Sequence, residues 1–142
     1  MQRYGIPVVL ALVIGLAFIG FRSLGDDDAP PLLIDLQPIE VTHSTESGLT
    51  VTILNNSENA FDGDVRVQVI QANSSVTTSI RVAIFPFGLA EGEIGGEWLT
   101  GQDAPVISIL LDPQEALNDS NDGNDTITVT CPLPDAKCQV EN

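Results

Sequence analysis

The chain has 142 residues and a formal net charge of −15, and residues 26–142 carry −17 with only Arg66, Arg81 and Lys137 as cations. This charge excludes nucleic acid as a direct partner, because neutralising phosphates requires clustered Lys and Arg. With one His, two Cys and one Lys, the chain lacks the groups for most hydrolytic and metal chemistries, so we expect no enzyme and no small-molecule substrate.

An apolar run without charge, Tyr4–Phe21, lies near the N-terminus. As a helix its 18 residues would be about 27 Å long, close to the lower limit for crossing a bilayer. Arg3 precedes the run, whereas Arg22 after it is outweighed by the acidic residues Asp26–Asp28. Basic residues favour the cytoplasmic side. We therefore expect membrane contact through Tyr4–Phe21, with the N-terminus in the cytoplasm and the C-terminal domain outside it.

Residues 1–24 are accordingly predicted to be a retained transmembrane anchor. The alternative is a cleaved secretory signal, because Ser23–Gly25 supplies the small residues of a cleavage site. Arg22 beside that site, and the length of the apolar run, favour retention. Residues 25–32 contain three Asp and two Pro, a composition that predicts a short extended stalk.

From Ile34 onward, apolar residues alternate with polar ones, which is the period of half-buried β-strands. Turns rich in Gly, Asn, Asp and Ser separate the alternating segments. We predict seven strands, at Ile34–Val41, Leu49–Leu54, Val65–Val69, Ile80–Ile84, Glu97–Thr100, Val106–Leu111 and Ile127–Cys131. The pattern predicts an all-β fold, a seven-stranded antiparallel immunoglobulin-like β-sandwich over residues 33–142, with an open barrel as the alternative. Trp98 is expected to fill the core between the sheets.

Four segments of this domain have the residues and the order typical of a known family. They are Ile34-Asp35-Leu36 with Ile39, Gly48–Asn56, Gly88–Glu93 with Glu97-Trp98 behind it, and the closing turn Asp112–Asp125. Together they resemble the CARDB family, the cell-adhesion-related domain found in bacteria. The resemblance implies an immunoglobulin-like sandwich displayed outside the cell and used for binding or spacing, and it implies no catalysis.

The closing turn contains four aspartates, Asp112, Asp119, Asp122 and Asp125. Carboxylate oxygens are the ligands that calcium takes in groups of six to eight. The spacing is one residue short of a calcium-binding EF-hand loop and no Glu closes it, and Asx side chains also stabilise tight turns through their own backbone. We predict a plain hairpin turn, with a calcium site as the alternative.

Cys131 and Cys138 are separated by six residues near the C-terminus. In an oxidising compartment such a pair is most simply a disulfide, here one that holds the tail to the last strand. Metal binding would need two more soft ligands, and only His43 is available. His43 lies among polar residues and is expected to be solvated in a loop.

Asn-X-Ser/Thr sequons occur at Asn55, Asn73, Asn118 and Asn124, all in predicted loops. They are candidate glycosylation sites. The alternative is that Asn, Ser and Thr are enriched together in turns for conformational reasons.

These features predict a non-enzymatic, membrane-anchored extracytoplasmic interaction or assembly module. We expect it to be an accessory subunit of a larger membrane or envelope complex, whose protein partners add a strand at a sheet edge or dock on loops. The alternatives are a structural surface-layer or filament component, and a secreted binding module released by signal cleavage.

Overall fold

The computed structural model describes residues 33–101, 103–112, 114–117, 119 and 121–141. Within these ranges nine β-strands and one short 3-10 turn follow each other along the chain. They are β1 (Leu36–Ser44), β2 (Gly48–Asn55), β3 (Phe61–Gln71), β4 (Ser74–Ile84), β5 (Leu89–Ile94), β6 (Ile107–Leu111), η1 (Asp122–Asn124), β7 (Thr126–Thr130), β8 (Ala136–Lys137) and β9 (Gln139–Val140).

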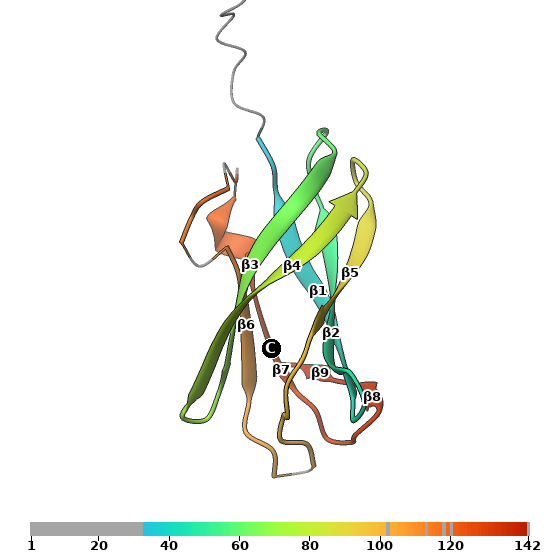
Figure 1. Cartoon of the computed structure of the whole chain (residues 1–142), viewed down its shortest axis with the longest axis vertical. Helices are drawn as coiled ribbons and strands as arrows, with labels where there is room; N and C mark the ends of the chain where they lie inside the picture. The colour runs from blue at the N-terminus through green and yellow to red at the C-terminus, as the bar shows by residue number, and fades with distance from the viewer. Residues whose placement is uncertain (1–32, 102, 113, 118, 120, 142) are drawn as a thin grey trace, which may run out of the picture. The chain divides into compact units, whose positions relative to one another are not determined.

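The strands form two antiparallel sheets that face each other as a sandwich (Figure 1). One sheet has the strand order β5-β2-β1-β8 and the other has the order β4-β3-β6-β7-β9. Alternate side chains of each strand point into the core, as Val65, Val67 and Val69 of β3 do. The predicted all-β antiparallel sandwich is confirmed.

The prediction of seven strands includes one segment that forms no strand and misses three strands, β5, β8 and β9. Glu97–Thr100 forms no strand, whereas Leu89–Ile94, which was expected to be a turn, forms β5. The inward positions of β5 include Gly92, where a Cβ atom would collide with the side chain of Ile80. Because a glycine replaces an apolar side chain there, the alternation that marks a strand is hidden. The two-residue strands β8 and β9 are too short to show any period.

The environment of His43 also differs from the expectation. His43 is buried within β1 instead of lying in a solvated loop, because β1 continues to Ser44 and its alternation turns His43 inward with Val41. Trp98 is buried in the core although its segment is not a strand.

No helix within residues 33–141, as far as they are described, is long and apolar enough to cross a membrane. The predicted anchor over residues 1–24 and the predicted stalk over residues 25–32 lie outside the described residues.

Candidate functional site

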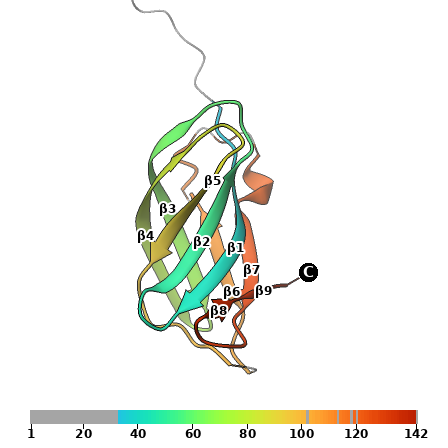
Figure 2. The same cartoon turned by 90° about the vertical axis from the view of Figure 1, so that its right-hand side faces the viewer.

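Three connections gather at the end of the sandwich where Leu33 lies, and we call it the Leu33 end (Figures 1 and 2). They are the β2–β3 connection at 56–60, the β4–β5 connection at 85–88 and the β6–β7 connection at 112–125. Hydrogen bonds join the first of them to the chain before β1: the Asn56 amide donates to the Asp35 carbonyl at 2.7 Å, and the Asn59 side chain donates to the Leu33 carbonyl at 3.0 Å.

Asn55, at the end of β2, holds two of these connections together. Its side chain is fully buried. The Nδ2 group donates to the carbonyls of Asn59, at 2.7 Å, and Phe85, at 3.3 Å, while Oδ1 accepts from the backbone N–H and the hydroxyl of Ser57. The Asn55 backbone N–H donates to the Gly88 carbonyl at 3.0 Å. One amide side chain therefore fixes both the β2–β3 and the β4–β5 connection.

The four sequons have different environments. Asn73 is exposed at the β3–β4 turn, whereas Asn55 is buried with its amide nitrogen engaged. Asn124, in η1, is half-buried and its Nδ2 donates to Asp35 Oδ1 at 2.9 Å. Asn118 lies outside the described residues. In the folded domain the Asn73 side chain is therefore accessible for glycosylation, whereas the Asn55 side chain is not.

Expression in a eukaryotic secretory host should place a glycan on Asn73 and leave Asn55 unmodified in the folded, secreted protein. A glycan on the Nδ2 atom of Asn55 would require space that the core does not have. Peptide mass spectrometry before and after glycosidase treatment would measure the occupancy of each site. Asn73→Gln is the control that should remove the modification, and a glycan found on Asn55 of folded protein would contradict the buried position.

The β6–β7 connection at 112–125 is rich in Asp, and we call it the acidic connection. Two of its carboxylates, those of Asp112 and Asp119, accept hydrogen bonds from backbone N–H groups. Asp112 has a φ of 44°, and its Oδ2 accepts a hydrogen bond from the Leu117 amide at 2.7 Å. Asp119 Oδ2 accepts from the Leu36 amide at 3.1 Å, and its Oδ1 accepts from the Asn121 amide at 2.7 Å. Asp119 therefore joins this connection to the start of β1. These contacts are the turn-stabilising role expected of Asx residues.

Asp125 occupies the centre of a group of acids at the Leu33 end. Its side chain is 6 % exposed, and its Oδ1 has no hydrogen-bond partner among the described residues. The pKa of Asp125 is raised to about 7, chiefly by burial and in addition by the negative charges of Asp119, Asp122, Asp35 and Asp112, in that order. Near neutral pH this carboxyl is therefore part protonated.

In the described part of the chain, no three or more His, Cys, Asp or Glu side chains are grouped so that they could hold a metal ion. Asp112 and Asp119 each have oxygens committed to backbone N–H groups, and Asp122 is exposed in η1. Calcium binding by these residues stays a prediction.

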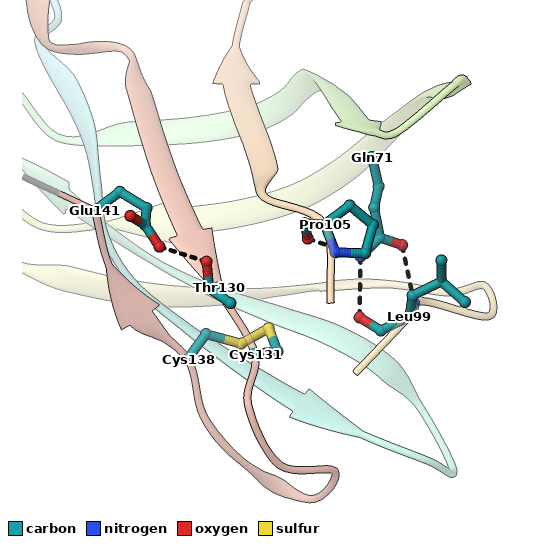
Figure 3. The surroundings of a disulfide bond; sticks show 7 residues. All are labelled: Gln71, Leu99, Pro105, Thr130, Cys131, Cys138 and Glu141. Carbon is teal, nitrogen blue, oxygen red and sulfur yellow. Dashed lines mark hydrogen bonds between the residues drawn. A yellow bond between two sulfur atoms is a disulfide. The ribbon is translucent and has the colours of Figure 1, made fainter. Parts of the chain in front are cut away.

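The opposite end of the sandwich carries the disulfide between Cys131 and Cys138, whose sulfur atoms are 1.98 Å apart (Figure 3). The tail beyond Cys131 adds β8 to β1 in one sheet and β9 to β7 in the other. Between the two short strands, the Cys138 amide donates to the Val41 carbonyl at 2.9 Å. The disulfide loop therefore lies across the side of the sandwich formed by β1 and β7.

A buried glutamine orders the long β5–β6 connection at this same end. Gln71 exchanges two hydrogen bonds with the Leu99 backbone, at 2.9 and 3.0 Å (Figure 3). Next to it, the Trp98 indole and the side chains of Val76 and Leu99 line a pocket of about 330 Å³.

Sequence reasoning missed three features of these surfaces. Asn55 and Gln71 were assigned to turns, and nothing in their neighbouring residues signals that they are buried and hydrogen-bonded. The third feature is a group of exposed apolar side chains, Phe85, Phe87 and Leu89. The Phe-Pro-Phe-Gly-Leu run itself was the available signal for them, since it combines turn residues with large apolar ones.

No known protein family matches the chain. No curated protein matches it either. Among solved structures, the fold is similar to a solution NMR structure of a domain from Methanosarcina acetivorans, named as a candidate cell surface protein. The TM-score is 0.53 with 19 % sequence identity, over 78 % of this chain and 95 % of the other. At this identity the likeness establishes a shared β-sandwich fold.

Proposed function

We propose that this chain is a membrane-anchored, extracytoplasmic interaction module without enzymatic activity, and that it serves as an accessory subunit of a larger membrane or envelope complex. Three observations support the location: the uncharged run Tyr4–Phe21, a disulfide of the kind found in oxidising compartments, and the fold shared with a candidate cell surface domain. The CARDB resemblance favours the same role. The strand orders β5-β2-β1 and β4-β3-β6-β7 are compatible with an immunoglobulin-like sandwich.

The observation that carries the proposal is a difference between the two sides of the sandwich. On one side the tail strands β8 and β9 extend the sheets beyond β1 and β7. On the other side β4 and β5 are the outermost strands of their sheets, with no further strand paired to them in the described part of the chain. An unpaired edge is a template for an added strand.

β4 is the longer of these two edges, with 11 residues from Ser74 to Ile84. A two-residue turn connects it to β3, with Gln71 opposite Ser74. In such a hairpin the pair flanking the turn shares both hydrogen bonds, so every second residue from Ser75 directs its N–H and C=O groups away from β3. These residues are Ser75, Thr77, Ser79, Arg81 and Ala83, and all five are exposed. An extended segment of a partner would find a row of free backbone groups there.

The test combines native size fractionation of membranes solubilised in mild detergent with a proline substitution in β4. Thr77→Pro removes an outward N–H group but leaves the pairing with β3 intact, and Thr77→Ala is the matched control that keeps the N–H group. Wild-type chain and Thr77→Ala should migrate in a defined assembly with other membrane proteins, identified by mass spectrometry. Thr77→Pro should lose these partners at unchanged thermal stability.

Two outcomes would count against the proposal. If Thr77→Pro keeps its partners, they bind elsewhere and the β4 edge is not the interaction surface. If the wild-type chain migrates alone, or leaves the membrane without residues 1–24, the subunit proposal itself fails.

A further inference from the structure

The β4–β5 connection and the first residue of β5 expose three large apolar side chains within five residues. Phe85 is 82 % exposed, Phe87 64 % and Leu89 59 %, and Phe85–Leu89 contains no charge. A soluble surface rarely presents such a group without a use, because contact with water is unfavourable for each of these side chains. The domain, residues 33–142, carries a net charge of −14. The uncharged apolar segment Phe85–Leu89, which we call the tip, is the exception that requires an explanation.

The tip has an ordered backbone that presents these side chains outward. The Gly88 amide donates to the Phe85 carbonyl at 2.9 Å, and the same carbonyl accepts from Asn55 Nδ2. Phe87 between them has a φ of 54°, in the left-handed region that aromatic residues seldom adopt. The fold therefore accepts backbone strain in a turn whose side chains make no part of its core.

The tip lies at the end of the sandwich where the chain continues toward the proposed membrane anchor. Asn55 contacts the carbonyls of both Phe85 and Asn59, and Asn59 contacts the Leu33 carbonyl, so the tip and Leu33 lie at the same end (Figures 1 and 2). Eleven residues, 22–32, separate Leu33 from the apolar run Tyr4–Phe21. Fully extended, eleven residues reach at most about 40 Å.

We propose that Phe85, Phe87 and Leu89 insert into the interfacial region of the bilayer that holds Tyr4–Phe21, so that the Leu33 end rests on the membrane and the disulfide end faces away from it. This inference rests on the membrane anchor of the proposed function. The occupant of the tip is lipid because the tether confines it near a bilayer, where an effective concentration in the millimolar range makes even weak partitioning sufficient.

Charge sets which lipid the tip contacts best. Glu58 in the β2–β3 connection and Glu91 in β5 are exposed near the tip, and no cation lies in either segment. Anionic headgroups would repel these carboxylates, whereas zwitterionic headgroups would not. The acids around Asp125 in the β6–β7 connection, Asp119 and Asp122 among them, lie at the same end and would be repelled by anionic headgroups as well. The tip is the uncharged part of this end, and it is the part that makes the contact.

The experiment uses the full chain reconstituted into phosphatidylcholine vesicles that contain a brominated lipid, which quenches tryptophan in the bilayer. Buried Trp98, at the disulfide end, gives the baseline signal. Phe85→Trp adds an indole at the tip, and Leu133→Trp is the matched control, because Leu133 is 62 % exposed in the disulfide loop. The added fluorescence of Phe85→Trp should be blue-shifted and quenched, and that of Leu133→Trp should be neither. Adding Phe87→Ser to Phe85→Trp should weaken the quenching.

The other outcomes separate the two proposals. If the chain resists alkaline extraction from vesicles but Phe85→Trp is quenched no more than Leu133→Trp, the anchor stands and insertion of the tip is refuted. If Phe85→Trp is shielded from aqueous iodide only in native membranes, a protein covers the tip and the lipid contact is refuted. If alkaline extraction releases the chain, the anchor itself fails. Weaker quenching in vesicles with anionic lipid, recovered by salt, would support the role of Glu58 and Glu91.

Discussion

Asn55→Ala should lower the free energy of unfolding by about 3 kcal/mol, because it removes the side chain that satisfies four buried or half-buried hydrogen-bonding groups at once. The carbonyls of Asn59 and Phe85 lose their shared donor, and the Ser57 backbone N–H loses its acceptor. Chemical denaturation of the purified domain would measure the change. The amide of Ser57 should also exchange hydrogen faster, since Asn55 Oδ1 protects it in the wild type.

Asn73→Ala is the matched control, because Asn73 belongs to another sequon and is exposed at the β3–β4 turn. It should change the free energy of unfolding by less than about 0.5 kcal/mol. If Asn55→Ala were equally mild, the hydrogen bonds of Asn55 would be replaceable by water. The fixed geometry of the β4–β5 connection would then need another explanation.

A periodic pattern of apolar residues marks some strands of this fold and is absent from others. β3 was predictable because Val65, Val67 and Val69 alternate with polar residues, and only such alternation distinguishes a half-buried strand from a turn. β5 was not predictable, because Gly92 occupies an inward position where Ile80 fills the space that a side chain would take. The reason for a glycine in β5 is thus a side chain of β4, which belongs to the opposite sheet.

The candidate site shows the same limit. The acidic connection was visible as a local cluster, and the turn-capping role of Asp119 follows from general Asx behaviour. No local pattern indicates that Asp35 joins this cluster, since Asp35 is 89 residues from Asn124, the residue it contacts. Asn55 was correctly noticed as part of a sequon, but its structural role depends on Phe85, which is 30 residues away. Contacts between distant segments carry no local signature.

The free energy of unfolding should contain a component that falls as the pH rises from about 4 to about 7, contributed by Asp125. The pKa of its carboxyl is raised from the ordinary value of 3.8 to about 7, chiefly by burial. Between these values the folded chain keeps a proton that the unfolded chain has released, so the folded state binds more protons and loses stability as the pH increases. The full pKa shift sets the upper limit of this loss of stability. Solvent screening near the surface reduces the expected loss in the free energy of unfolding to about 2 kcal/mol.

Asp125→Asn isolates this component, because an amide fills nearly the same space and stays neutral at every pH. The variant should be more stable than the wild type at pH 8, and the difference should shrink as the pH falls from about 7 to about 4. Asp122→Asn is the control: it removes one charge that raises the pKa of Asp125, but Asp122 itself is exposed, so its effect on stability should be smaller. Carbon-13 NMR of the Asp125 carboxyl would give its titration midpoint directly. A midpoint near 4, or a stability difference independent of pH, would show that water reaches Asp125 and that the acids around it are screened from one another.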